Sequence, residues 1–164
     1  MRFSPLVLML GLATSTIAVS VHGQRPDDQL APQSVEMLKK GQAALAAGNL
    51  IAADDALETA LIVDPRNRAA FVTMARVAIK QRLFGQAIRL TNKALALEPN
   101  DRDAIAVQGE AMVELGAVPR AKQNLAKLQK LCTTGCPQLT VLGATIARGP
   151  AMAAVSTPAT KKVN

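Results

Sequence analysis

Two cysteines, Cys132 and Cys136, carry the most reactive side chains in this sequence. They stand four positions apart in the stretch LCTTGCP and are followed directly by Pro137. Gly135 can adopt a left-handed turn, so a reversal that brings the two sulfur atoms together is feasible. Two thiolates cannot complete a tetrahedral zinc site by themselves. The pair predicts a structural disulfide, and a reducible pair, a metal-binding pair and two buried free thiols stay open as alternatives.

The string CTTGCP is similar to the Cys-x-x-x-Cys-Pro motif of certain assembly factors with a thioredoxin-like fold, which bind copper or carry out redox chemistry. The similarity is confined to this short string. Those proteins also need a downstream histidine and an alternating pattern of strands and helices, and this sequence has neither. Thiol redox or copper handling is therefore the alternative function, ranked behind a structural disulfide.

The remaining polar residues do not assemble a reactive set. Asp54 with Asp55, and Glu110 with Glu114, are adjacent or share one helix face, and no nucleophile or metal ligand accompanies them. His22 is the only histidine, and Trp and Tyr are absent. General acid-base catalysis and transition-metal binding usually need such residues. We expect no catalytic activity, no cofactor and no bound metal.

The formal net charge of the chain is +7. Its basic residues are spread along the sequence, although Arg120, Lys127 and Lys130 could share one face of a helix, which we interpret as a solvated face. Binding of single-stranded nucleic acid relies on aromatic side chains that stack on bases. Beyond the first residues only Phe71 and Phe84 are aromatic, and both suit helix packing. Nucleic acid is therefore not an expected partner.

The first residues have the outline of a secretory signal. Arg2 is the single early cation, and residues 6–21 are apolar apart from small and hydroxyl side chains. This pattern predicts a signal peptide at 1–23, cleaved near Gly23 or after Ser20, and a periplasmic or secreted protein. An uncleaved membrane anchor is the alternative, but the segment would be a weak spanning helix of marginal length. No integral membrane span is expected after cleavage.

A second pattern covers most of the chain. The stretch VDPRNRAAF at 63–71 returns as LEPNDRDAI at 97–105, 34 residues later. A fixed period of this size is typical of stacked helix pairs. Three units follow at 34–67, 68–101 and 102–135. Helices are expected at about 34–47, 50–63, 68–81, 84–97, 101–115, 118–131 and 137–148, where Pro, Asn, Asp and Gly mark their ends.

Small residues align when the three units are placed in register. The columns are Gly41, Ala75 and Gly109 in the first helix, then Ala53, Ala87 and Ala121, and Ala60, Ala94 and Leu128, in the second. The first two columns are expected where the paired helices cross, because small residues allow the backbones to approach closely.

Together with Pro65 and Pro99, this pattern resembles the tetratricopeptide-repeat family. The resemblance implies an all-α, right-handed solenoid of three helix-turn-helix repeats, which the helix at 137–148 would cap. A flexible linker at 24–33 and a disordered tail at 149–164 should flank the helical domain at 34–148. The tail is basic and could touch an anionic surface weakly.

The resemblance also implies a binding groove formed by the first helix of each unit. Carried over residue by residue, its positions are Val35, Leu38, Gln42 and Leu45, then Ala69, Val72, Arg76, Ile79 and Lys80, then Asp103, Ala106, Glu110, Val113 and Glu114. The family's carboxylate clamp, which holds the free C-terminus of chaperones, lacks its residues here. Leu38, Gln42, Val72 and Thr73 occupy four of its places.

These observations predict an exported, non-catalytic scaffold that binds a peptide or a partner's helix in the groove. The sequence does not name this partner. A chaperone-tail receptor is disfavoured because the clamp residues are missing.

The leader prediction can be tested directly. Residues 1–30 fused to a reporter that is active only outside the cytoplasm should give reporter activity, and the N-terminus of the exported protein should be Gln24 or a close neighbour. N-terminal sequencing checks the second point. Recovery of exported protein that still begins with Met1 would support the anchor instead.

Overall fold

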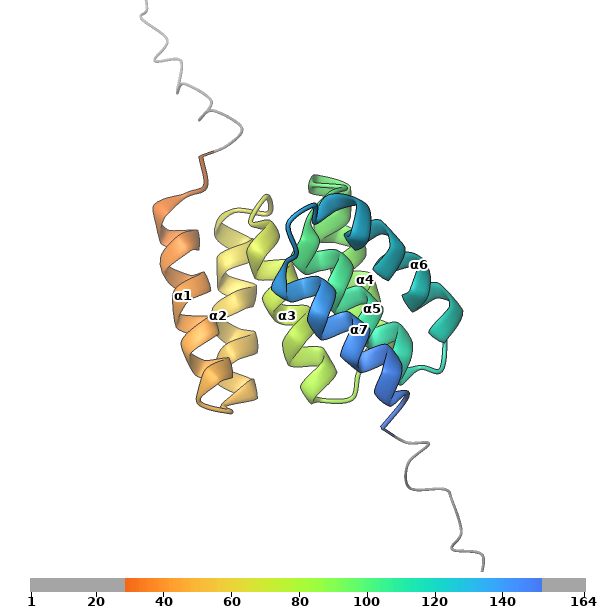
Figure 1. Ribbon diagram of the computed structural model, residues 1–164. Coiled ribbons are helices and arrows are strands. Elements are labelled where there is room, and N and C mark those ends of the chain that lie inside the picture. The colour runs from red at the N-terminus through yellow and green to blue at the C-terminus, as the bar shows by residue number, and fades with distance from the viewer. Residues whose placement is uncertain (1–28, 152–164) are drawn as a thin grey trace, which may run out of the picture.

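The structure, a computed structural model, describes residues 29–151. These residues contain seven α-helices and no strand (Figure 1), so the predicted all-α class is confirmed. The helices are α1 (Pro32–Ala46), α2 (Leu50–Val63), α3 (Arg68–Lys80), α4 (Phe84–Leu97), α5 (Arg102–Glu114), α6 (Val118–Leu131) and α7 (Pro137–Arg148). The predicted signal peptide lies outside the described residues, as do residues 24–28 of the predicted linker and residues 152–164 of the predicted tail.

The helices form a solenoid of three antiparallel pairs. α1 packs on α2, α3 on α4 and α5 on α6, and α7 closes the array against α5 and α6 (Figure 1). α1 contacts α3, α3 contacts α5 and α5 contacts α7, whereas α2, α4 and α6 do not contact one another. The first helix of each pair therefore lies on the inner side of the array and the second on the outer side.

Helix α1 begins two residues before its expected start. Pro32 occupies the first turn, where the missing amide proton costs no hydrogen bond. The amide of Ala31 donates to the carboxylate of Asp64 at 2.9 Å, which anchors the start of α1 to the end of α2. The predicted linker at 24–33 is thus helical at its last two positions.

One turn conformation joins the helices within each pair. Gly48 and Gly116 have φ values of 76° and 77°, in the left-handed region where glycine was expected. Arg82 stands at the corresponding position of the second unit and has a φ of 64°. The second unit therefore makes the same turn with a residue that adopts this conformation less readily.

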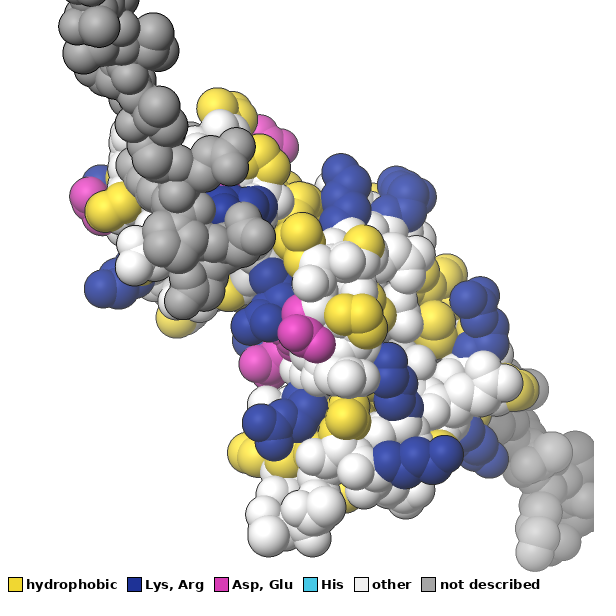
Figure 2. All heavy atoms as spheres, turned by 90° about the horizontal axis from the view of Figure 1, so that it is seen from above, with side chains coloured by type: hydrophobic (Ala, Val, Ile, Leu, Met, Phe, Trp, Pro, Cys, Tyr) yellow, Lys and Arg dark blue, Asp and Glu magenta, His cyan; other side chains and the backbone are white. Residues whose placement is uncertain are grey.

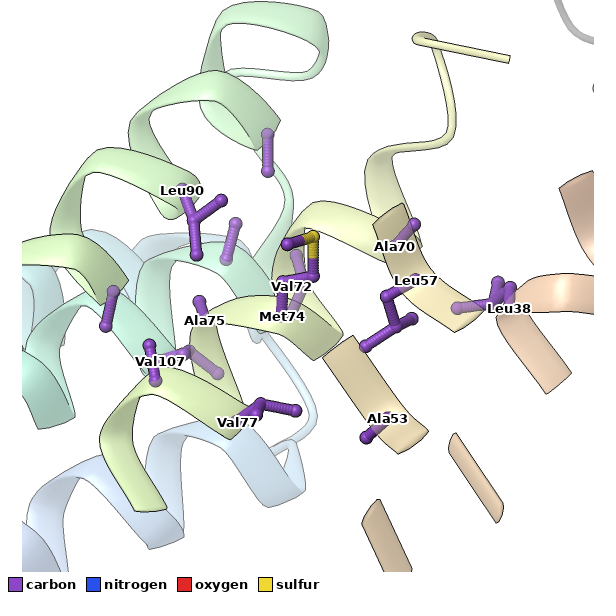
Figure 3. Close-up of a cluster of buried hydrophobic side chains, with 14 of the residues drawn as sticks. Leu38, Ala53, Leu57, Ala70, Val72, Met74, Ala75, Val77, Leu90 and Val107 are labelled. Carbon is purple, nitrogen blue, oxygen red and sulfur yellow. The ribbon is translucent and has the colours of Figure 1, made fainter. Parts of the chain in front are cut away.

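The core depends on the aligned small residues (Figure 3). Ala53, which Figure 3 labels, is fully buried, and so are Ala87 and Ala121. A methyl group added to Gly41 would stand 2.5 Å from Cγ of Leu57, so glycine permits the contact between α1 and α2. Gly109 departs from the expectation, because a methyl group there would meet Leu142 of α7 at 2.7 Å. This glycine makes room for the capping helix rather than for α6.

Successive pairs are joined by polar contacts at one repeated position. Between the first two units, Asn67 donates to the hydroxyl of Ser34 at 2.8 Å, and its own oxygen accepts from the amide of Ala70. One repeat later, Asp101 stands at the position of Asn67 and Arg68 at the position of Ser34. The side chains of Asp101 and Arg68 form an ion pair. The same position therefore serves both as the helix cap and as the link between units.

The carboxylate of Asp64 is the most strongly perturbed acid in the described part of the chain. Hydrogen bonds from the Arg66 side chain and from the amides of Ala31 and Arg66 lower the pKa of Asp64 from 3.8 to about 2, against the opposing effect of burial. A lowered pKa in the folded state means that the ionised carboxylate stabilises the fold.

This shift predicts an acid-sensitive first repeat. The stabilisation from Asp64 should be complete above its unfolded pKa near 3.8 and should be lost as the pH falls to about 2. Chemical denaturation of Asp64→Asn and the unchanged protein should show a free-energy difference that is largest near neutral pH and shrinks over this window. A difference that does not change between pH 5 and pH 2 would contradict the prediction.

Candidate functional site

Two adjoining pockets form a trough across the inner side of the array. The smaller, of about 100 Å³, includes Gln42 of α1 and Arg76 of α3 in its wall. The larger, of about 560 Å³, reaches the turn before α7. Arg68, Asp101 and Asp103 line both pockets. We call this surface the inner trough.

The larger pocket has a cause in the repeat register. Asn67 and Asp101 link the first and second pairs to their neighbours, and Gly135 stands at the corresponding position of the third unit. Arg102, which corresponds to Arg68, therefore has no carboxylate at the position that Asp101 holds for Arg68, although Glu98, Asp101 and Asp103 also line this pocket. Both Arg102 and Gly135 line the larger pocket. The pocket lies where the first two units place a linking side chain.

One carboxylate ties three helices together along the trough. Asp103 of α5 accepts from Arg76 of α3 at 3.1 Å and from the side-chain amide of Gln138 in α7 at 3.2 Å. The ion pair with Arg76 is half exposed, so its own stabilising contribution is small, in the range below about 1 kcal/mol. Its role is to hold the side chains of the trough in a defined arrangement.

The acidic end of the predicted groove lies partly under the capping helix. Burial raises the pKa of Glu110, and the positive charges of Arg76, Arg148 and Lys80 reduce this effect. Glu114 accepts from Arg148 at 3.0 Å and from the amide of Ala151 at 2.9 Å. Glu114 thus anchors the end of α7 and the residues that follow it.

The structure separates the predicted groove residues into two groups. Leu38, Val72, Ala106 and Val113 are 9%, 4%, 3% and 0% exposed, so they belong to the core and do not form an open contact surface. Ala106 and Val113 are buried in clusters that side chains of α7 complete. Leu38, Ala106 and Val113 are therefore not accessible as groove contacts, contrary to the prediction, whereas the buried Val72 still reaches the wall of the smaller pocket.

The other predicted groove residues remain accessible to different degrees. Gln42, Arg76 and Lys80 are exposed, and Leu45, Ile79 and Glu110 are half-buried. Among the predicted groove positions, Gln42, Ala69, Val72, Arg76 and Asp103 come together in the smaller pocket. The trough is also lined by residues that were not predicted from the sequence: Arg68, Asp101, Arg102 and Gln138. The repeat register does pair Arg68 with Asp101, and it places Gly135 at the corresponding position for Arg102.

Cys132 and Cys136 form a disulfide with an S–S distance of 2.06 Å, as predicted. It joins the end of α6 to the start of α7, and Gly135 within its loop has a φ of 85°. Cys136 also lines the larger pocket. Within residues 29–151 no three His, Cys, Asp or Glu side chains are grouped so that they could hold a metal ion. No helix in this range is long and apolar enough to cross a membrane.

Comparison with known proteins agrees with this architecture. The sequence profile of the tetratricopeptide repeat matches residues 44–109. The tetratricopeptide-repeat domain of Sgt2 from Aspergillus fumigatus is 20% identical, has a TM-score of 0.68, and is matched over 87% of this chain and 95% of its own. A comparison with curated proteins finds no match.

Two further solved structures contain bound peptides or partners. The first such domain of Spaghetti (RPAP3), bound to the HSP90 peptide SRMEEVD, is 20% identical with a TM-score of 0.64, over 73% of this chain and 99% of its own. The TPR2B domain of yeast Sti1, in a complex with pHsp70, is 16% identical with a TM-score of 0.65, over 72% of this chain and 98% of its own.

The stacked helix pairs and the inner trough place this chain among the helical-repeat proteins. The profile match over residues 44–109 and the fold shared with these domains show that its helix pairs resemble tetratricopeptide repeats.

The disulfide should stabilise the end of the array. In the chain-entropy model, closing so short a loop contributes about 2 kcal/mol. Replacing both cysteines by serine should lower the free energy of unfolding by about this amount. Amide exchange should increase most in α7, while α1 and α2 serve as the internal reference. Unchanged exchange in α7 would show that packing alone holds the capping helix.

The raised pKa of Glu110 gives a prediction of opposite sign to that for Asp64. A raised pKa means that ionisation of Glu110 costs stability, so its favourable contribution is present below the ordinary glutamate pKa of 4.5 and is lost as the pH rises through the folded pKa. Glu110→Gln should therefore be more stable than the unchanged protein at neutral pH, and this advantage should shrink on acidification. Thermal unfolding across pH 3 to 8 measures it, and a less stable variant at neutral pH would refute it.

Proposed function

We propose that this protein is a non-catalytic scaffold whose inner trough binds a peptide segment that carries an acidic side chain. The larger pocket supports this proposal most directly. Arg102 lies at its wall, and the carboxylate that Asp101 provides for Arg68 has no counterpart at Gly135. An acidic side chain from a partner would fit this gap.

The trough also suits an extended segment rather than a compact ligand. It runs from Gln42 of α1 to Gln138 of α7 through two adjoining pockets. Its exposed polar side chains offer donors and acceptors along this line, and the half-buried Leu45 and Ile79 add apolar surface on the neighbouring helix faces. Similar domains of Spaghetti and Sti1 have been solved with HSP90 and Hsp70 partners, which supports peptide binding as the mode.

The partner's sequence should differ from those chaperone tails. The clamp positions expected from the family hold Leu38, Gln42, Val72 and Thr73, and three of these four side chains are buried. We therefore expect peptides selected on this protein to bind more tightly than SRMEEVD.

The proposal can be tested with peptides selected from a displayed random library. Arg102→Glu should weaken their binding about tenfold or more, because it replaces a charge-assisted contact by repulsion. Arg120→Glu is the matched control, since it makes the same charge change on the exposed face of α6. Fluorescence anisotropy measures both affinities. Equal loss of affinity in the two variants, or none in Arg102→Glu, would refute the assignment.

Arg76→Glu is a poorer probe than Arg102→Glu. Arg76 pairs with Asp103, so a glutamate there would repel a neighbour that also holds α7 through Gln138. Loss of binding in that variant would not separate a lost contact from a displaced capping helix.

We also propose that the scaffold acts outside the cytoplasm. The support is the signal pattern of residues 1–23 together with the disulfide, since disulfides persist mainly in oxidising compartments. A thiol redox or copper role gains no comparable support, because Cys132 is buried.

A further inference from the structure

The outer side of the array has a charge pattern that the inner trough does not explain. On α2, the exposed residues Ile51, Asp55, Glu58 and Ile62 are spaced four, three and four positions apart. This spacing places them on one stripe along the helix. Ile51 and Ile62 are 76% and 81% exposed, more than any other large apolar side chain in the described part of the chain.

Helix α2 is acidic on this stripe and has no basic residue anywhere in its sequence. The carboxylates of Asp55 and Glu58 form no ion pair within residues 29–151. Two apolar ends thus flank an acidic centre that no neighbouring helix neutralises.

Helix α4 carries the complementary stripe. It has no acidic residue, and its exposed Arg89 and Lys93 lie between Leu83 and Leu97, which are 47% and 45% exposed. The ammonium group of Lys93 lies over the ring of Phe71 in α3, 5.6 Å from its centroid. α4 therefore presents two exposed basic side chains one turn apart, with Leu97 one turn further along the helix.

Because of the repeat period, equivalent residues of the two stripes lie at the same height along the helix axes. Asp55 and Arg89 are equivalent residues of successive units, and Glu58 corresponds to the residue before Lys93. α2 and α4 run in the same sense and do not contact each other, so both stripes are open to a second molecule.

We propose that two copies of this chain pair through their outer faces, α2 of each copy lying on α4 of the other. A twofold axis that runs between α2 and α4, along their direction, produces this arrangement. It keeps the heights equal, so Asp55 meets Arg89, Glu58 lies near Lys93, and Ile51 and Ile62 lie opposite Gly85 and Ala96, the equivalent residues of α4. Because the interface is isologous, each contact occurs twice.

An anionic surface would fit the outer side of the array less well than a second copy of the chain does. α6 is also basic, but α2 would bring Asp55 and Glu58 close to the same surface and oppose its binding. Basic side chains are also distributed over the view in Figure 2 rather than gathered in one patch. A second copy satisfies both the acidic and the basic stripe at once.

The test uses two charge-reversed variants. Asp55→Arg with Glu58→Arg makes both stripes basic, and Arg89→Asp with Lys93→Asp makes both acidic. Analytical ultracentrifugation should show the unchanged protein as a dimer that dissociates at high salt, and each variant alone as a monomer. A one-to-one mixture of the two variants should form a heterodimer, because each basic stripe then faces an acidic one.

The matched control is Lys122→Asp with Lys130→Asp, which changes the same charge on α6 and should leave the dimer intact. Circular dichroism checks that every variant keeps its helices. Should the double variant on α4 unfold, Arg89→Asp alone serves in the mixture, since it leaves Lys93 on Phe71.

A monomer at the highest soluble concentration, or a mixture that stays monomeric, would overturn the proposal. Binding of a monomeric protein to vesicles that contain phosphatidylglycerol, lost in the α4 variant, would assign the basic stripe to an anionic lipid surface instead. These outcomes do not depend on peptide binding in the inner trough.

Discussion

The stacking of each helix pair on the next is the interaction on which the rest of the structure depends. One pair has an apolar face that it cannot bury alone, and a neighbouring pair covers it. Ala53, Ala87 and Ala121 let the paired helices approach closely, because a larger side chain would separate their backbones. The polar contacts of Asn67 and Asp101 then fix the position of each helix pair relative to the next. Packing supplies most of the stability, and these side chains set the register.

The last unit shows what happens when this repeated link stops. Gly135 replaces Asn67 and Asp101, and the chain turns through the disulfide into α7 instead of starting another pair. α7 covers α5 with Leu142, which needs the space left by Gly109. The residue that ends the repeat thus also opens the larger pocket beside Arg102. Termination of the array and formation of the candidate site have one structural cause.

Much of the fold could be predicted from the sequence because its signals are local. The prolines and cap residues of a 34-residue period mark helix ends within about two residues of those observed. The site was harder to predict, because the accessibility of a groove residue depends on where α7 docks. α7 stands in the register of a further first helix, since Pro137 follows Asp103 by 34 residues, but the sequence alone did not show how closely it covers Ala106 and Val113. The alignment of the units places Gly135, which has no side chain, at the position of Asn67 and Asp101. Only the observed ion pair of Arg68 with Asp101 shows that a contact between units is missing there.

The two sides of the array differ in the way their charges are satisfied. On the inner side, Asp101 and Asp103 are held by arginines from the neighbouring pair, whereas Arg102 forms no ion pair within residues 29–151. On the outer side, the second helices do not touch, so their charges cannot neutralise one another within one chain. The acids of α2 and the bases of α4 are separated by this geometry rather than by sequence distance. A solenoid therefore keeps complementary stripes apart within one molecule and leaves them available to another.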